Sequence, residues 1–184
     1  MNIALYGGSF DPPHIGHVAV VDAALKALDI EKVIVIPAFV NPFKSGTHAS
    51  ADLRLQWLQK IFASNSRVEV SDFETRQKRA VKSIETVRHF AELYGHIYFI
   101  IGADNLAELK QWHQYEALDS LVTWVIASRD QIEIDTHFIQ LAVTHPVSST
   151  QLREAPDEAA LPEAVAQEIR TYYENNKEDH ARTH

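Results

Sequence analysis

Apolar residues fall into two kinds of pattern along the chain. Short continuous apolar runs are typical of strands buried on both faces, and they occur at residues 3–6, 33–36, 97–101 and 121–127. Residues 67–71 alternate between polar and apolar positions like a strand, and residues 142–143 give a last short one. Stripes with helical spacing lie between the strands, at about residues 15–29, 53–61, 84–91 and 161–173. Strands therefore alternate with helices, which predicts an α/β fold.

The same alternation predicts where a ligand would bind. Successive strand–helix units form a parallel sheet that helices cover on both faces. Ligands of such sheets bind beyond the carboxyl ends of the strands, near the point where the strand order reverses. The chain has 184 residues, which suits one domain over residues 1–184, and the polar residues 175–184 are expected to form a frayed tail. The loops that directly follow strands are therefore the first place to look for chemistry.

Composition narrows the class of protein. Hydrophobic residues make up 46% of the chain, which is enough for an ordinary core. The lack of cysteine excludes disulfides, thiolate nucleophiles and cysteine-type zinc sites, and it fits a reducing cytoplasm. We see no signal-peptide pattern and no apolar run near the roughly 20 residues of a membrane helix. A formal net charge of -8 disfavours a nucleic-acid partner but allows a small phosphate ligand. We expect a cytoplasmic protein without nucleic-acid or membrane partners.

The loop after the first predicted strand carries the most specific motif. Residues 7–17 read GGSFDPPHIGH, in which two glycines let the backbone approach a ligand and two prolines stiffen the loop. A helix begins near His14, and its exposed N–H groups and dipole favour an anion. His14 and His17 face the same way, so they can stabilise charge that develops on a phosphoryl group. The alternatives are a turn with two surface histidines and, less favoured, a zinc site that lacks a third ligand.

A second strand-to-helix junction, near the other end of the chain, repeats this chemistry. Residues 147–153 read VSSTQLR. The hydroxyls and first-turn N–H groups of Ser148, Ser149 and Thr150 can cradle a phosphate, and Arg153 adds a cation from the next turn. An ordinary helix cap is the alternative interpretation. The pairing with the first motif favours a phosphate site.

Both motifs resemble those of nucleotidylyltransferases. The first is similar to the GGSFDPPHxGH signature of the nicotinate-mononucleotide adenylyltransferase family, and the second to that family's ISSTxxR motif. Residues 14–17 also spell the HIGH signature of class I aminoacyl-tRNA synthetases, whereas no G-x-G-x-x-G dinucleotide fingerprint follows the strand. The resemblance covers nearly the whole chain and implies a single-domain, Rossmann-like, doubly wound parallel sheet. It implies ATP-binding roles for Gly7, Gly8, Ser9, Phe10, His14, His17, Gly102, Asp104, Ser148, Ser149, Thr150 and Arg153.

The resemblance extends to a block after the strand at residues 97–101. Residues 102–105 read GADN and, together with Trp112, match the family's GADN…W block. This match implies that Gly102 and Asp104 lie beside the nucleotide, where a carboxylate can accept hydrogen bonds from ribose hydroxyls. Trp112 would stack on the pyridine ring of the acceptor, although a core position is an equal alternative. Trp57 and Trp124 follow stripe and strand patterns and are interpreted as core.

Three more residues are placed by resemblance alone. Lys44 would meet the ATP phosphates, although Phe43 replaces the histidine that family members usually have before this basic residue. Ser83 stands where a family threonine helps to recognise the nicotinate carboxylate. Arg129 stands where the family has an arginine, and it would contact the acceptor phosphate. Ser83 and Arg129 are therefore candidate acceptor-binding residues, each with an ordinary solvated polar side chain as the alternative.

The implied activity joins the AMP part of ATP to nicotinate mononucleotide, giving nicotinate adenine dinucleotide and pyrophosphate. The acceptor phosphate is already ionised, so no protein nucleophile is needed. His14, His17 and Lys44 are the expected catalytic residues, and Mg²⁺ is expected with ATP rather than at a protein metal site. Nicotinamide mononucleotide and phosphopantetheine stay open as acceptors. A tRNA-synthetase fragment and a non-catalytic nucleotide-binding regulator are the more distant alternatives.

Overall fold

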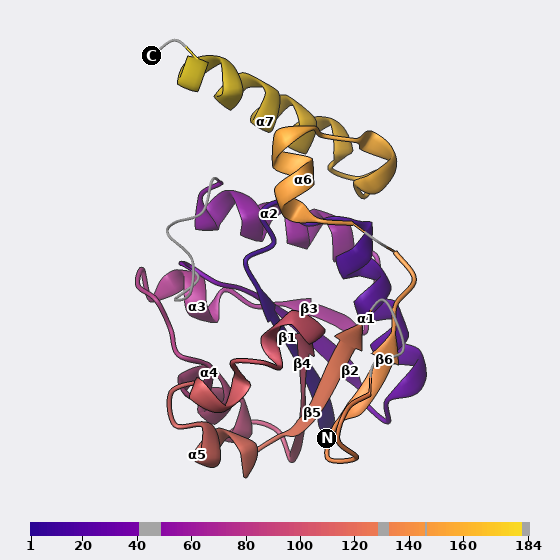
Figure 1. The fold of residues 1–184 in the computed structure, drawn as a ribbon, viewed down its shortest axis with the longest axis vertical. Coiled ribbons are helices and arrows are strands. Elements are labelled where there is room, and N and C mark those ends of the chain that lie inside the picture. The colour runs from indigo at the N-terminus through magenta and orange to yellow at the C-terminus, as the bar shows by residue number, and fades with distance from the viewer. Residues whose placement is uncertain (41–48, 129–132, 146, 182–184) are drawn as a thin grey trace.

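The computed structural model describes residues 1–40, 49–128, 133–145 and 147–181, and within these ranges the side chains up to residue 176. Its centre is a six-stranded sheet in the order β3-β2-β1-β4-β5-β6, in which all neighbouring strands are parallel (Figure 1). The strands are β1 (Asn2–Gly8), β2 (Lys32–Pro37), β3 (Val68–Val70), β4 (His96–Gly102), β5 (Thr123–Ser128) and β6 (Ile139–Ala142). The helices are α1 (Ile15–Ala27), α2 (Ala51–Phe62), α3 (Phe73–Arg76), α4 (Ser83–Ala91), α5 (Tyr115–Asp119), α6 (Ser149–Glu154) and α7 (Ala166–Ala181).

Alternate residues of the strands supply two separate cores, one on each face of the sheet. In β1, the side chains of Ala4 and Tyr6 join a cluster with residues of α1 and α2. Ile3 and Leu5 face the other way and join a cluster with residues of α4 and α5. Because both faces are covered, every one of these strand positions is buried, which explains the continuous apolar runs in the sequence.

A third apolar cluster attaches the C-terminal part of the chain to α2. Trp57 of α2 packs against residues that precede and belong to α7, among them Val165, Ile169 and Tyr173. Helices α6 and α7 consequently lie beyond the carboxyl ends of the strands, toward which the β5 arrow points (Figure 1). This cluster places the second sequence motif at the same end of the sheet as the first.

The strand order creates the expected crevice. The chain runs from β1 outward to β2 and β3 and then returns to β4 on the other side of β1. The carboxyl ends of β1 and β4 are therefore neighbours whose following loops separate to opposite sides of the sheet. None of the helices in the described part of the chain has the length and apolar character of a membrane span.

Most predicted elements are confirmed, and the exceptions are short or terminal. The α/β fold with a parallel sheet is confirmed, and Trp57 and Trp124 are core residues with 1% and 0% of their surface exposed. The short helices α3 and α5 were not predicted, because four or five residues carry too little periodicity. The last helix was predicted at residues 161–173 but is α7, which begins later and includes residues 175–181 of the expected tail.

Candidate active site

A single cavity with a volume of about 720 Å³ lies at the carboxyl ends of the strands. Its lining comes from the loops after β1, β2 and β4, from the first turns of α1, α4 and α6, and from α3. Many of the residues singled out in the sequence contribute to this lining: Gly7, Gly8, Ser9, Phe10, His14, His17, Ser83, Gly102, Asp104, Trp112, Ser149 and Arg153. Both strand-to-helix motifs and the GADN block therefore face one space.

Two histidines cap the first turn of α1. The His14 Nδ1 accepts a hydrogen bond from the Gly16 N–H at 3.1 Å, and the His17 Nδ1 accepts one from the His14 N–H, also at 3.1 Å. This arrangement is a capping box in which imidazoles take the places usually held by Ser or Thr and Glu. The two rings stack with their centroids 3.7 Å apart. The sequence prediction that both side chains face the same way is confirmed.

The cap also fixes which ring nitrogen carries the proton. Each Nδ1 accepts a backbone hydrogen bond, so a neutral imidazole at either position must carry its proton on Nε2. Burial, and then the neighbouring His14 imidazole, lower the pKa of His17 well below its usual range. His17 is consequently neutral near pH 7. Its Nε2–H is a hydrogen-bond donor without a formal charge in the unliganded protein.

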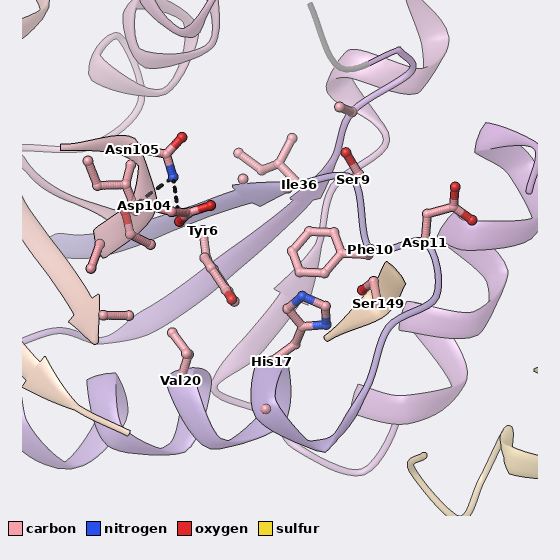
Figure 2. A pocket seen from close by; sticks show the side chains of 18 of the residues that line it. Tyr6, Ser9, Phe10, Asp11, His17, Val20, Ile36, Asp104, Asn105 and Ser149 are labelled. Atoms are coloured by element: carbon pink, nitrogen blue, oxygen red, sulfur yellow. Dashed lines mark hydrogen bonds between the residues drawn. The ribbon is translucent and has the colours of Figure 1, made fainter. Parts of the chain in front are cut away.

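Steric constraints hold this loop in one shape. A Cβ on Gly16 would lie 2.9 Å from two atoms of the His14 ring, so a larger residue would displace the cap. Phe10 has a φ of 49°, a left-handed conformation that is uncommon for a bulky residue. Its ring is buried and packs edge-on against that of His17, with centroids 4.8 Å apart (Figure 2). A strained residue of this kind persists only where the surrounding contacts determine it.

The second motif is hydrogen-bonded to the first. The Arg153 Nη1 donates to the Asp11 carbonyl oxygen at 2.6 Å, and the Ser149 hydroxyl donates to the Pro12 carbonyl oxygen at 2.8 Å. These bonds bring together loops that are more than 130 residues apart, with sequence separations of 142 and 137. The two candidate phosphate-binding motifs, far apart in the sequence, therefore meet in one place.

Not every residue of the second motif lies at the cavity. Ser148 and Thr150 are not among the cavity-lining residues, and Thr150 instead accepts a hydrogen bond from the Arg153 Nη2 at 3.3 Å. In the first turn of a helix, successive side chains point in different directions, and here Ser149 is the one that faces the loop. Of the three hydroxyl residues that were expected to bind phosphate, only Ser149 therefore lines the cavity.

The loop after β4 brings an acidic group to the cavity. Asp104 and Asn105 both line it, and the Asn105 Nδ2 donates to the Gly102 carbonyl oxygen at 3.2 Å and to Asp104 Oδ1 at 3.4 Å (Figure 2). A Cβ on Gly102 would lie 2.6 Å from Asp104 Oδ1, so only glycine leaves this carboxylate in its place. The Asp104 carboxylate therefore has a defined position from which it can accept hydrogen bonds.

A different group of side chains lines the cavity near α4. Ser83 begins the helix, and Thr86, one turn later, donates its hydroxyl proton to Glu74 Oε1 at 2.7 Å. Burial raises the pKa of Glu74 to about 7, while the Thr86 hydroxyl opposes this rise. Trp112 is half-buried and packs against Phe99 with ring centroids 6.4 Å apart, so it belongs to the core and to the cavity wall together.

Several lining residues were missed in the sequence. Glu74, Asn105 and Ser128 follow or end strands, and the rule that loops after parallel strands carry function would have found them. Thr86 shares a helix face with Ser83 at a spacing of three, a weaker signal. His145 also lines the cavity and belongs to none of the motifs identified in the sequence. The predicted residues Lys44 and Arg129 lie outside the described residues.

The described residues hold no group of three or more His, Asp or Glu side chains that could bind a metal ion. The chemistry they offer is instead that of an anion site joined to an apolar and aromatic wall. Imidazole N–H donors, a guanidinium and a serine hydroxyl line the cavity, together with Trp112 and the start of α4. Such a cavity suits a nucleotide that carries several phosphates beside an aromatic acceptor.

Comparisons with known proteins agree with this geometry. Residues 5–155 match the model of the cytidylyltransferase-like family. A Sulfurimonas denitrificans protein named "Probable nicotinate-nucleotide adenylyltransferase" is 52% identical over 98% of both chains. A Nitratiruptor sp. protein of the same name is 45% identical over 94% of this chain and 99% of its own.

A solved structure extends the comparison to three dimensions. The nicotinic acid mononucleotide adenylyltransferase of Plasmodium falciparum, complexed with NaAD, matches with a TM-score of 0.75 at 21% identity. The match covers 94% of this chain and 97% of the other, and at this identity it speaks for the fold. The chain belongs to the cytidylyltransferase-like family and, within it, to the nicotinate-nucleotide adenylyltransferases.

Proposed function

We propose that this chain transfers the adenylyl group of ATP to nicotinate mononucleotide, producing nicotinate adenine dinucleotide and pyrophosphate. One observation carries the proposal: Arg153 and Ser149 are hydrogen-bonded to the loop that presents His14 and His17, and all four line one cavity. The relatives named above and the Plasmodium falciparum enzyme complexed with NaAD support the same activity.

The reaction needs positioned donors rather than a protein nucleophile. An oxygen of the acceptor phosphate attacks the α-phosphorus of ATP in line, the bond from this phosphorus to the bridging oxygen of the β-phosphate breaks, and pyrophosphate leaves with the bonding electrons. The Nε2–H groups of His14 and His17 donate to phosphate oxygens, and the Arg153 guanidinium offsets their negative charge. A neutral imidazole donor suits a site that must also release the product anion.

The nucleoside and the acceptor occupy the other parts of the cavity. Asp104, held by Gly102 and Asn105, accepts hydrogen bonds from ribose hydroxyls of ATP. Trp112 stacks on the pyridine ring, whose positive charge a π face tolerates. The start of α4 at Ser83 offers a hydroxyl and first-turn N–H groups to the nicotinate carboxylate. Lys44 and Arg129 keep their proposed phosphate-binding roles, outside the described residues.

Magnesium enters this proposal as part of the MgATP substrate. The described residues form no group of three or more side chains that could hold a metal ion. When bound, Mg²⁺ neutralises charge on the phosphates and on the leaving pyrophosphate. The protein's own residues position the two substrates and exclude water around the reacting phosphorus.

The test is an acceptor comparison with the purified chain. MgATP is supplied with nicotinate mononucleotide, nicotinamide mononucleotide or phosphopantetheine, and both pyrophosphate and the adenylylated product are measured. We expect the highest kcat/KM with nicotinate mononucleotide. A higher kcat/KM with either other acceptor would replace the proposed substrate. Nucleotide binding without pyrophosphate release on any acceptor would replace the enzyme by a nucleotide-binding regulator.

A further inference from the structure

A fully buried arginine lies behind the cavity wall. Arg54 is in the first turn of α2, and 0% of its surface is exposed. Residues 54, 57, 58 and 61 share one helix face by their spacing, and Trp57 and Leu58 are buried on that face as well. An arginine therefore takes a position that the periodicity assigns to the core, where charged side chains are rarely found.

Within the described residues, Arg54 donates four hydrogen bonds, and all of them go to main-chain carbonyl oxygens. The Nε donates to Ala49 at 3.0 Å, and the Nη2 donates to Phe39 at 3.0 Å. The Nη1 donates to Ser9 at 2.6 Å and to Ala38 at 2.7 Å. Ser9 belongs to the loop after β1, and Ala38 and Phe39 follow β2 directly. One guanidinium thus joins the loops that leave two neighbouring strands.

Holding a cation in this position costs free energy. Burial lowers the pKa of Arg54, and the Asp11 carboxylate and Tyr173 oppose this effect. An arginine stays charged nevertheless, because its pKa in water is far above neutrality. An apolar side chain would avoid the desolvation cost but would leave four buried or partly buried carbonyl groups without this donor. The forked, charged side chain of Arg54 therefore satisfies the carbonyl groups of these loops, at a position where the periodicity predicts an apolar core residue.

The bond to the Ser9 carbonyl also orients the peptide group that joins Ser9 to Phe10. In a planar trans peptide the N–H points away from the C=O, so the Phe10 N–H is directed away from Arg54. Phe10 is the residue with a left-handed φ of 49°, and its ring packs on His17. Arg54 consequently binds the carbonyl that immediately precedes the strained residue. Through this residue it acts on the position of the His17 ring.

We propose that Arg54 is a positioning residue for adenylyl transfer: its guanidinium holds the carbonyls of Ser9 and Ala38 and thereby sets the loop that places Phe10 and His17 against the ATP phosphates. This inference rests on the proposed function. Arg54 does not contact the reacting atoms itself, and the acceptor pocket around Trp112 and Ser83 lies on other elements. Its effect should fall on MgATP binding and turnover, and not on acceptor binding.

The test compares Arg54→Lys with a control at the other end of the sheet. Lysine keeps the charge, but as a point donor it cannot reproduce the fork that reaches four carbonyls. Arg67 also donates to three main-chain carbonyls, those of Leu25, Ile30 and Glu31, but far from the cavity. Arg67→Lys therefore removes a comparable structural contact without touching the loop. Thermal unfolding, MgATP affinity by calorimetry without acceptor, kcat, and KM for both substrates are measured for each variant.

We expect Arg54→Lys to fold and to lose kcat by about 10- to 100-fold, because small displacements of positioning groups have effects of this size. Its MgATP affinity should fall about tenfold while the KM for nicotinate mononucleotide stays within about threefold of wild type, as for an interaction confined to one substrate. Arg67→Lys should keep the wild-type kcat and lose less melting temperature, because water can replace the bonds of the exposed Arg67.

Three results would overturn the proposal. A folded Arg54→Lys protein with kcat and MgATP affinity close to wild type would remove the positioning role. Equal losses of kcat in the Arg54 and Arg67 variants would reduce the effect to general stability. Failure of both Arg54→Lys and Arg54→Met to fold would make the guanidinium a requirement of the fold only. A wild-type chain that binds MgATP but adenylylates no acceptor would contradict the proposed function, and calorimetry would still measure the effect of Arg54 on the nucleotide.

Discussion

At each end of the sheet an arginine donates hydrogen bonds to main-chain carbonyl oxygens, but one of these arginines is exposed and the other is buried. At the amino end, the exposed Arg67 donates to carbonyls between α1 and β2, and water can replace any bond that is lost. At the carboxyl end, Arg54 is buried, and its four hydrogen bonds to carbonyl oxygens lie in buried or partly buried surroundings, where water replaces a lost bond less readily. The difference teaches that this protein places its costly buried polar groups where loops must be held for chemistry. Substitutions at the two ends should accordingly differ in kind.

The largest expected difference concerns histidines. His17→Ala at the carboxyl end removes a donor to the ATP phosphates, and we expect the fold to persist while turnover falls by roughly 10² to 10³, or about 3–4 kcal/mol. His96→Ala is the matched variant at the amino end, where the ring is hydrogen-bonded to the Thr123 hydroxyl, away from the cavity. It should keep the wild-type rate. Pyrophosphate release measures both, and near-normal turnover in His17→Ala would remove that residue from the mechanism.

Two glycines, one at each end of the sheet, test the same difference between the ends, because substituting them adds one methyl group and removes no functional side chain. In Gly16→Ala the new Cβ would lie 2.9 Å from the His14 ring, so the cap must shift, and we expect turnover to fall about 10- to 100-fold. In Gly95→Ala, at the amino end, the nearest heavy atom to the new Cβ is the Met1 nitrogen at 3.6 Å, an ordinary contact. That variant should be fully active. Equal activity of the two variants would contradict the assigned role of the His14 cap.

The pH dependence of stability should change with one buried carboxyl. The folded pKa of Glu74 is raised from 4.5 to about 7, so folding takes up a proton between these values and stability falls as pH rises through the interval. Glu74→Gln should flatten this slope. The change in the free energy of unfolding across the interval should shrink by about 1–2 kcal/mol, which is less than the whole pKa shift implies because water in the cavity screens the carboxylate. Urea unfolding at pH 5 and pH 8 measures it.

Thr86→Val sharpens this result, because it should raise the pKa of the same carboxyl and strengthen the pH dependence that Glu74→Gln removes. The Thr86 hydroxyl donates to Glu74 and lowers its pKa, so its removal should extend the pH-dependent interval to higher pH. An unchanged slope in both variants would show that Glu74 is not the group responsible.

The smallest effect is expected for an ion pair at the amino end. Lys32 and Glu69 join β2 to β3 with a separation of 3.0 Å, and both side chains are substantially exposed. Lys32→Ala should cost less than about 1 kcal/mol of stability, as for other exposed pairs, and should leave kcat unchanged. A loss of turnover here would break the contrast between the two ends of the sheet.

The chemistry at the carboxyl end was largely visible in the sequence. The first motif follows a buried strand, and a rule of parallel sheets places it at the ligand crevice. The meeting of Arg153 with Asp11 depended instead on resemblance, because no local pattern says that residues 142 positions apart share a cavity. The order of the strands was likewise not deducible from periodicity, which reports burial but not neighbours.

The buried arginine shows why other features were missed. The apolar stripe of α2 was assigned to Leu53, which is only half-buried, whereas Arg54 is the fully buried residue. Hydrophobicity assigns charged residues to the surface, and the four carbonyls that satisfy Arg54 belong to loops without any sequence signal for that role. Glu74 and Thr86 were missed for a related reason, because the role of each depends on a hydrogen bond to the other, twelve residues away in the sequence.

The contact between Asp11 and Tyr173 has a consequence for the order of events during translation. Asp11 accepts hydrogen bonds from the Ala49 N–H and from the Tyr173 hydroxyl, and the latter residue lies in α7, 162 positions further along the chain. The aspartate therefore emerges from the ribosome long before this partner, which is synthesised 162 residues later. A nascent chain or a fragment that stops before α7 carries the complete nucleotide motif and still lacks the hydroxyl that secures it. We therefore expect the loop that carries this motif to be secured only after α7 has been synthesised.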